Sequence, residues 1–184
     1  MSDTQFYTGK GDSGDTGRLG GEERLDKSDL LIDTIGTVDE ATCAIGMARA
    51  LAREPRVQKG LLEVQRRLYR LMSHISATPD LRKRYTGLTE ADVAWLEDLI
   101  ARLSEDAPEV KIFVLPGDSP GGAASHQARA VVRRAERRLV ALAAVEPTIG
   151  AANLAFMNRL SSLMFVAALQ EDRLAVGEIT FTTP

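Results

Sequence analysis

Apolar side chains recur at helical spacing over most of the chain, beginning near residue 28. Five segments show this spacing, and they predict helices over about 28–53, 55–75, 89–103, 119–144 and 149–170. Together they cover about 60% of the residues, well above the usual third of a globular protein. Because short loops join these helices, the pattern predicts an all-α fold, a five-helix bundle with a Gly-rich N-terminal loop.

Residues with known preferences for helix ends stand at the predicted boundaries. Ser28 or Asp29 is suited to cap the first helix, and Pro55 suits the first turn of the second. Thr89 opens a capping sequence for the third helix, with aspartate in place of the usual glutamate. Ser119 then precedes a proline at the start of the fourth helix, so four of the five starts have a local signal.

Two short segments lie outside the helices and the N-terminal loop. The apolar run 110–115 ends at a Pro-Gly pair and is expected to be extended, as is the weakly alternating segment 178–184. The sequence has no internal repeat of solenoid length. We therefore expect one domain over 1–184, made of a loop over 1–27, a bundle over 28–170 and a tail over 171–184.

Composition and charge narrow the functional class. The chain has 184 residues, of which 44% are hydrophobic, and a formal net charge of −3, so a general nucleic-acid binder is not expected. No apolar run approaches the roughly 18 residues of a membrane span, and we expect no membrane partner. The polar N-terminus has no signal-peptide pattern, and Cys43 is the only cysteine. These features predict a cytoplasmic protein without disulfides.

The N-terminal segment is unusually rich in glycine, with six between positions 9 and 21. Ordering so much glycine is entropically costly, so a regular element is not expected there. Two interpretations stay open: a disordered tail, or a loop whose backbone N–H groups wrap an anion. The segment 9–14 formally matches G-x-G-x-x-G, but no strand precedes it and no helix follows, which excludes a dinucleotide-binding fold.

Metal-ligand patterns are not evident in the sequence. Bundles often hold metals through Glu-x-x-His pairs, but neither His74 nor His126 has a glutamate three residues before it. We therefore interpret both histidines as packing or surface residues, and we predict no protein ligand for a resident metal.

The predicted fourth helix carries five arginines within ten residues. Arg129, Arg133 and Arg137 fall four apart and share one stripe, while Arg134 and Arg138 lie on a neighbouring face. A solvated charged face is one interpretation. Because like charges repel and guanidinium groups match phosphate geometry, a polyphosphate site is the other.

An acidic pair in the first helix is a possible partner for these arginines. Asp39 and Glu40 lie near Gly36, where a second helix can approach closely. An acidic residue there can meet an arginine of the fourth helix, either within the chain or across a subunit boundary. Sequence patterns leave that choice open.

Taken in order, these segments resemble a known family, the PduO-type ATP:cob(I)alamin adenosyltransferases. Six stretches that span nearly the whole chain show the similarity: YTGKGDSGDTG (7–17), GGEERLDKSD (20–29), IGTVDEATCAIG (35–46), FVLPGDSP (113–120), ARAVVRRAERRLVAL (128–142) and NRLSSLMFV (158–166). The resemblance implies a five-helix bundle, usually a homotrimer, with active sites between neighbouring subunits. It implies transfer of the 5′-deoxyadenosyl group of ATP to the cobalt of cob(I)alamin, with release of triphosphate.

The same resemblance implies roles for individual residues. The ATP phosphates would be wrapped by the N-terminal loop through Thr8, Gly11, Asp12 and Gly14, with Lys27 reaching them from the following segment. Arg133 would bind the triphosphate and stabilise its departing charge. Arg137 and Glu136 would complete the surroundings of Mg²⁺–ATP, and Asn158 would contact the nucleotide.

Two further roles follow from the resemblance. Phe113 would press on the lower face of the corrin and displace its axial base, although composition alone would assign this residue to the core. Asp39 would pair with Arg129 across the subunit boundary. A reductase that supplies Co(I) is the implied protein partner.

Some positions depart from the family pattern. Gly9 stands where a lysine or arginine is common, and Asp118 replaces a usual glycine near the implied corrin pocket; other departures are Ile35, Thr42, Val132 and Ser162. The alternative function is therefore a non-catalytic bundle that binds nucleotide or corrinoid as a carrier or sensor.

Overall fold

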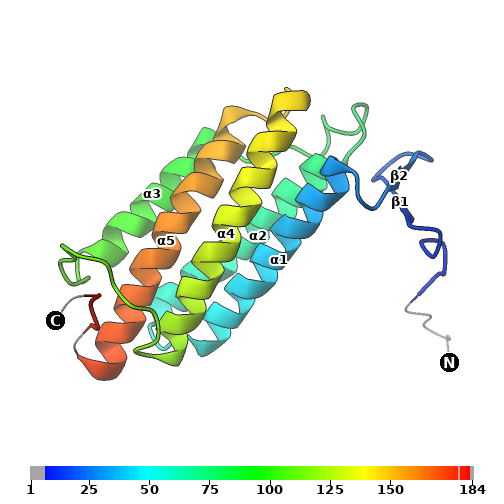
Figure 1. Ribbon diagram of the computed structural model, residues 1–184. Helices are drawn as coiled ribbons and strands as arrows, with labels where there is room; N and C mark the ends of the chain where they lie inside the picture. Colours follow the sequence, from blue (N-terminus) through cyan, green and yellow to red (C-terminus); the bar gives the residue numbers. More distant parts are fainter. Residues whose placement is uncertain (1–6, 178, 183–184) are drawn as a thin grey trace, which may run out of the picture.

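The computed structural model describes residues 7–177 and 179–182, and within them it confirms the five predicted helices. The elements follow in the order β1 (Asp15–Gly17), β2 (Arg24–Asp26), α1 (Leu30–Leu51), α2 (Pro55–Ser76), α3 (Glu90–Ser104), α4 (Pro120–Val145) and α5 (Ala151–Val176). Figure 1 shows the helices as one bundle, with the β1–β2 hairpin standing off the bundle beside α1.

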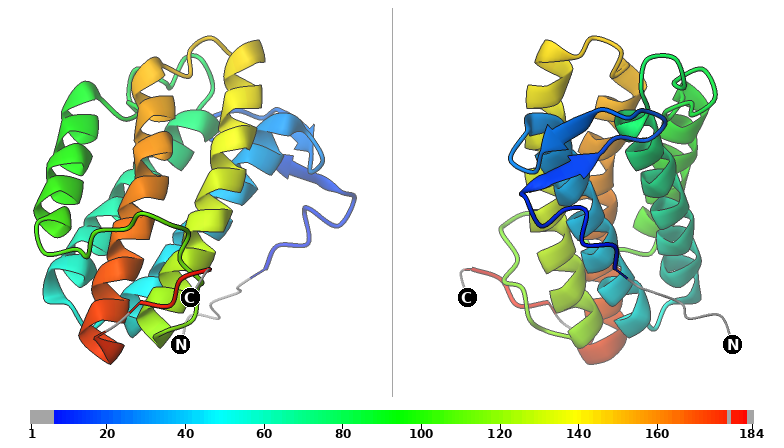
Figure 2. Two further views of the ribbon diagram at one scale, coloured as in Figure 1. Left: turned by 60° about the vertical axis from the view of Figure 1, so that its left-hand side comes forward. Right: turned by 90° about the vertical axis from the view of Figure 1, so that its right-hand side faces the viewer.

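The helices pack around one apolar core. α4 lies between α1 and α5, α3 packs on the other side of α5, and α2 packs chiefly on α1 (Figures 1 and 2). The largest fully buried side chains are leucine, isoleucine, methionine and phenylalanine, and they come from all five helices: Ile45, Leu61, Leu68, Leu71, Ile75, Leu96, Leu103, Leu139, Phe156, Met157, Leu160 and Leu163. Burial of these side chains is the main force that holds the bundle together.

Local capping fixes where most helices begin. Asp29 accepts a hydrogen bond from the backbone N–H of Leu31, and Thr89 forms the predicted capping box with Asp92. Ser119 accepts from the N–H of Gly122 at the start of α4. These caps satisfy N–H groups that the helices themselves leave unpaired.

The end of α5 differs from the sequence prediction. The helix continues to Val176, so the bundle does not end at residue 170 and the tail does not begin at 171. The polar run 170–172 resembles the end of a helix in sequence, but all three side chains are buried at the base of the bundle.

The buried polar run 170–172 ties together the ends of three other helices. Gln170 donates to the carbonyl of Leu103 near the end of α3, at 2.6 Å. Glu171 accepts from the two backbone N–H groups of residues 53 and 54 just before α2. Asp172 accepts from the hydroxyl of Ser119, the cap of α4, at 2.7 Å. These bonds explain why polar side chains occur inside the last turns of a core helix.

The N-terminal loop contains a short regular element that the glycine content did not predict. β1 and β2 pair antiparallel, with Asp15 opposite Asp26 and Gly17 opposite Arg24. Arg24 also bonds both carboxylate oxygens of Asp15, at 2.7 and 2.8 Å. A charged pair on the surface therefore adds to the backbone pairing of the hairpin.

The segment between α3 and α4 crosses the outer side of α5 (Figure 2). It is joined to the C-terminal tail by a short antiparallel bridge. Val114 pairs with Phe181. The N–H of Leu115 donates to the carbonyl of Thr180, and the N–H of Thr182 donates to the carbonyl of Phe113. The tail thus holds Phe113 and its neighbours in an extended conformation at the face of the bundle.

Within the described residues, one helix is long and apolar enough to cross a membrane by length and composition, namely α5. Of its most apolar 18-residue window, 61% is buried inside the bundle. That burial is what the core helix of a helical bundle requires.

Candidate active site

The arginines of α4 separate into two sets. Arg134 forms an ion pair with Glu40 of α1, and Arg138 pairs with Asp33 of the same helix at 2.9 Å. In the part of the chain that the structure describes, Arg133 and Arg137 have no carboxylate partner. The face of α4 that carries Arg134 and Arg138 is therefore joined to α1 by ion pairs. On the predicted stripe, the guanidinium groups of Arg133 and Arg137 are available for an anion.

Arg133 and Arg137 line a cavity of about 320 Å³, which we call the arginine cavity; its other lining residues are Glu136, Val140 and Asn158. Asn158 of α5 donates to Oε1 of Glu136 at 2.9 Å. Arg137 donates to the backbone carbonyl of Arg133 at 3.0 Å, which holds its side chain along the helix. The structure thus brings together four residues that the family resemblance assigns to the triphosphate and nucleotide.

The arginine cavity suits a polyphosphate with a bound divalent cation. Two guanidinium groups present forked donors that match phosphate oxygens. Glu136 keeps a second carboxylate oxygen beyond the one that Asn158 binds, and Mg²⁺ is commonly held by one carboxylate together with substrate phosphates. Among the described residues, no three His, Cys, Asp or Glu side chains gather as a metal site. The residues present therefore fit Mg²⁺ that arrives with a nucleotide.

A second cavity, of about 380 Å³, lies on the same side of the bundle, and we call it the Phe113 cavity. Residues 110–114 form one wall, and the helices contribute His126, Arg129 and Phe165. Phe113 itself is 85% exposed. It is therefore not a core residue, contrary to what composition alone indicates.

The two cavities follow each other along α4 and α5. Arg129 lines the Phe113 cavity and Arg133 the arginine cavity, one helical turn apart. On α5 the corresponding residues are Phe165 and Asn158. Two ligands bound in these cavities would therefore be neighbours.

Arg129 has an unusual environment. Its guanidinium carbon lies 6.0 Å from the ring centre of Phe165, and its Nε atom is buried without a hydrogen-bond partner in the described structure. Asp39 is exposed on α1. Because α1 and α4 run antiparallel, with Glu40 beside Arg134, Arg129 lies opposite a later part of α1. The single chain does not bring Asp39 and Arg129 together.

Asp118, the added charge near this cavity, is used within the chain. Its carboxylate accepts a hydrogen bond from the backbone N–H of Thr180 at 2.8 Å. The side chain thus anchors the C-terminal tail to the loop before α4, and it is not a lining residue of the Phe113 cavity.

The N-terminal loop is folded around its own backbone. Lys27 donates from Nζ to the carbonyl of Gly11 at 2.6 Å, and its N–H donates to the carbonyl of Gly14 at 2.9 Å. Gly14 has a φ of 90°, which an L side chain rarely adopts. Lys27 therefore contacts Gly11 and Gly14, two of the loop residues with which the family resemblance groups it at the ATP phosphates.

Other loop contacts hold the predicted phosphate-binding residues in place. The N–H of Lys10 donates weakly to the hydroxyl of Thr8, and that of Asp12 donates to the carbonyl of Gly9. The guanidinium of Arg24, together with the hydroxyl of Ser13, keeps the pKa of the Asp15 carboxyl well below its usual range. The loop stands beside α1, away from the α4–α5 face (Figure 1). One chain therefore does not join the loop to the arginine cavity.

Comparison with known proteins identifies the family. The family model for cobalamin adenosyltransferase matches residues 6–171. The corrinoid adenosyltransferase of Bacillus subtilis is 38% identical over 96% of this chain and 92% of its own, and the cobalamin adenosyltransferase of Cupriavidus metallidurans is 39% identical over 95% and 91%. This chain belongs to the cobalamin adenosyltransferase family.

Solved structures of the family share the fold. A phenylalanine-to-alanine variant of the PduO-type ATP:corrinoid adenosyltransferase from Lactobacillus reuteri, complexed with cobalamin and ATP, superposes with a TM-score of 0.85. It is 31% identical, and the match covers 98% of this chain and all of that one. An arginine-to-lysine variant of the same enzyme, complexed with ATP, gives a TM-score of 0.83 at 31% identity over 95% of this chain and 98% of that one.

Sequence reasoning missed some residues that this adenosyltransferase-family chain places in the cavities. Phe165, Val140 and His126 are lining residues to which the sequence analysis gave no role in a site. Phe165 and Val140 resemble ordinary apolar helix positions. Neither ring nitrogen of His126 has a hydrogen-bond partner among the described residues, and only the folded surroundings can show this.

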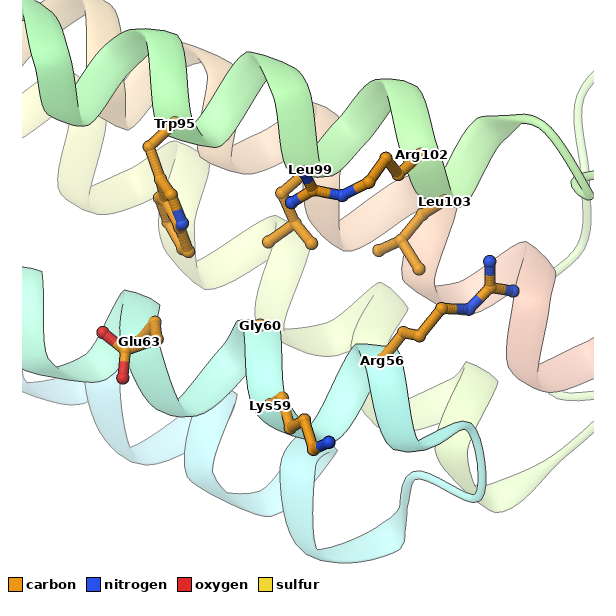
Figure 3. A pocket seen from close by; sticks show the side chains of 8 residues that line it. All are labelled: Arg56, Lys59, Gly60, Glu63, Trp95, Leu99, Arg102 and Leu103. Atoms are coloured by element: carbon orange, nitrogen blue, oxygen red, sulfur yellow. The ribbon is translucent and has the colours of Figure 1, made fainter.

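A third hollow lies between α2 and α3, away from both cavities (Figure 3). Trp95 and Leu99 of α3 point toward α2, and the guanidinium of Arg67 lies 3.7 Å from the Trp95 ring centre. Two cations of this hollow, Arg56 and Arg102, already pair with carboxylates. None of the predicted site residues of this family member lies there.

Proposed function

We propose that this protein transfers the 5′-deoxyadenosyl group of ATP to the cobalt of cob(I)alamin, forming adenosylcobalamin and triphosphate. One observation supports this most directly. A cavity with two arginines that have no carboxylate partner among the described residues and an apolar cavity with an exposed phenylalanine follow each other on one face of α4 and α5. That arrangement suits a polyphosphate nucleotide beside a large, largely apolar ring.

The arginine cavity would take the triphosphate of ATP. Arg133 and Arg137 would bind its oxygens and stabilise the charge that grows on the leaving group. Asn158 would contact the nucleotide, and Glu136 would complete the coordination of Mg²⁺. When bound, Mg²⁺ neutralises part of the phosphate charge.

The Phe113 cavity would take the corrin ring. Phe113 would lie against the lower face of the ring, where it excludes water and displaces the axial base. A four-coordinate cobalt(II) is easier to reduce than one with an axial ligand, so an apolar side chain favours formation of Co(I).

The reaction then needs positioning more than activation, because Co(I) is itself a strong nucleophile. A cobalt electron pair forms the bond to C5′ of ATP, and the C5′–O bond breaks with its electrons moving to the triphosphate. Cobalt is oxidised from Co(I) to Co(III) in this step. The protein would hold C5′ in line with the cobalt and stabilise the departing charge.

A neighbouring copy of the chain would complete each site, in a homotrimer. The loop residues Thr8, Gly11, Asp12 and Gly14, with Lys27, stand beside α1 and would reach the arginine cavity of the neighbour. Asp39, exposed on α1, would pair with Arg129 of the adjoining copy. Among the described residues of its own chain Arg129 forms no ion pair, which leaves its guanidinium for a carboxylate of the adjoining copy and supports this proposal.

Two features of the cellular setting belong to the same proposal. A reductase would supply the electron that converts cobalt(II) to Co(I), as the family resemblance implies. The protein would act in the cytoplasm, where its single cysteine, Cys43, stays reduced.

Isotope labelling tests which bond breaks. ATP carrying ¹⁸O at the 5′ bridging position is supplied with chemically reduced cobalamin. Since the C5′–O bond is the one that breaks, we expect the label in triphosphate. Label retained on the adenosyl group, or release of diphosphate instead, would contradict the proposal.

Complementation tests whether sites are shared between copies. Lys27→Ala and Arg133→Ala chains are each expected to be inactive alone. When the two are co-expressed, about a quarter of randomly assembled interfaces combine an intact loop with an intact arginine. Recovery of that share of activity supports shared sites, and no recovery excludes them.

A further inference from the structure

The segment that carries Phe113 lies beside the C-terminal tail and is held by it (Figure 2). Within the described residues, every hydrogen bond that leaves residues 110–118 goes to residues 180–182. Tail residues 179–182 in turn bond only to that segment, as far as the structure describes the chain. Phe113 is 85% exposed, so burial of its own side chain does not fix it. The two segments therefore keep each other in place.

Asp118 makes the side-chain bond of this junction. Its carboxylate accepts from the N–H of Thr180 at 2.8 Å, while the N–H of Leu115 donates to the carbonyl of the same Thr180 at 2.9 Å. The segment thus engages both backbone groups of Thr180. A third bond, from the N–H of Thr182 to the carbonyl of Phe113 at 2.9 Å, completes the junction.

The bond from Asp118 fixes the register of the tail. With Thr180 engaged on both sides, Phe181 pairs with Val114. Successive side chains of an extended segment point to opposite faces, so a slip by one residue would turn the tail over. Backbone groups alone would pair in either register, whereas Asp118 has a defined position, directly before Ser119, the cap of α4. The start of α4 therefore sets where the tail binds.

We propose that Asp118 is a positioning residue for the corrin: through the tail, it holds Phe113 at the Phe113 cavity before the ring binds. Ordering a loop at the moment of binding costs free energy, and a loop that is already ordered avoids that cost. The preformed wall presents Phe113 to the lower face of the ring in one arrangement. The role toward a corrin rests on the proposed function, whereas the tether between Asp118 and the tail does not.

Amide hydrogen exchange tests the tether in the protein without ligands. Asp118→Ala removes the acceptor, and Asp118→Asn keeps a carbonyl oxygen in its place. We expect the amides of Leu115 and Thr182 to exchange about tenfold faster in D118A than in the wild type, and D118N to stay within about threefold of it. Unchanged exchange in D118A would overturn the proposal without any corrinoid.

Thr180 offers a matched pair of variants on the other side of the same bond. Thr180→Pro removes the N–H that Asp118 accepts, whereas Thr180→Ala keeps it. We expect D118A and T180P each to raise the KM for cob(I)alamin about fivefold to tenfold, with the KM for ATP unchanged. If both act through one bond, the double variant is no worse than either single one, and T180A matches the wild type. Additive losses in the double variant would contradict the shared bond.

The spectrum of bound cob(II)alamin gives a readout that a purely structural role would not move. In the presence of ATP, D118A should show a smaller share of four-coordinate cobalt, and D118N should restore it. The midpoint of thermal unfolding should stay that of the wild type, because the junction lies outside the core. A lower midpoint with a parallel rise in both KM values would indicate a structural residue and would overturn the proposal.

The outcomes separate this inference from the function on which it rests. No adenosylcobalamin from the wild type means that the proposed function fails, and the corrin role of Asp118 fails with it. An active wild type with D118A indistinguishable from it in KM and in the cob(II)alamin spectrum overturns the role of Asp118 alone.

Discussion

Asn158 of α5 donates a hydrogen bond to Glu136 of α4 at 2.9 Å, and both residues line the arginine cavity. The bond fixes the carboxylate one helical turn from Arg133, which lies on the same helix face and has no carboxylate partner among the described residues. The cavity therefore holds both signs of charge at defined positions, which is what recognition of a metal-bound polyphosphate requires.

Replacing Arg133 tests the role of this charge in the chemical step. Because Arg133 is proposed to meet the charge that develops on triphosphate, Arg133→Ala should lower kcat by roughly 10²-fold or more. Arg134→Ala is the matched control, since Arg134 pairs with Glu40 on the surface and should leave kcat within about twofold. Steady-state rates with saturating ATP measure both. Near-wild-type turnover by the Arg133 variant would remove it from the mechanism.

Phe113 should affect the corrin without affecting the nucleotide, because the two cavities are separate. Phe113→Ala is expected to bind ATP with an unchanged Kd but to fail with cob(II)alamin under reduction, as the axial ligand is no longer excluded. Absorption spectra of bound cob(II)alamin report its coordination. Leu115→Ala, an exposed apolar residue of the same segment that does not line the cavity, serves as the control. Loss of ATP binding in the Phe113 variant would indicate that the residue is structural.

Assembly should depend on Asp39 and Arg129. Either residue changed to alanine removes one side of a proposed pair between copies, so we expect a shift from trimer toward smaller species at micromolar concentration. Light scattering on a sizing column measures the mass. Asp33→Ala is a matched control because Asp33 pairs with Arg138 inside one chain. Unchanged trimers in both variants would show that this pair does not hold the copies together.

An ion pair that lines neither cavity makes the stability of the fold depend on pH. Arg82 bonds both carboxylate oxygens of Glu146, and with the hydroxyl of Thr148 it lowers the pKa of Glu146 from 4.5 to about 2. Since the pKa is lower in the folded state, the pair stabilises the protein above pH 4.5, and this contribution is lost as the pH falls toward 2.

Glu146→Gln should therefore lower the free energy of unfolding by about 1–2 kcal/mol at pH 7 and by almost nothing near pH 2. Urea unfolding across this range measures the difference from wild type. Glu97→Gln, which removes a surface pair with Arg159, should change stability little at any pH. A deficit of E146Q that stays constant with pH would contradict the assignment.

Much of the fold follows from local sequence signals, because helix periodicity and capping residues act over a few positions. Thr89 and Ser119 marked the starts of α3 and α4 correctly. Local signals did not predict where α5 ends, because Glu171 and Asp172 are polar in sequence yet buried against the starts of α2 and α4. Such contacts join residues more than fifty positions apart, and no local pattern encodes them.

The candidate site was predictable in part for the same reason. Spacing grouped Arg133 with Arg137, and the structure places both on one cavity. Spacing could not show which arginines already have partners, because Glu40 and Asp33 lie on another helix. The sequence indicates only that His126 is a packing or surface residue, since its lack of a hydrogen-bond partner among the described residues is a property of the folded surroundings.

The central claim is adenosyl transfer, and one anaerobic assay tests it most directly. Purified protein, Mg²⁺–ATP and chemically reduced cob(I)alamin are mixed, adenosylcobalamin is followed by its absorption spectrum, and triphosphate is assayed in parallel. The account predicts that both products form in equal amounts over many turnovers. Tight ATP binding without turnover would contradict it and would favour a non-catalytic carrier or sensor.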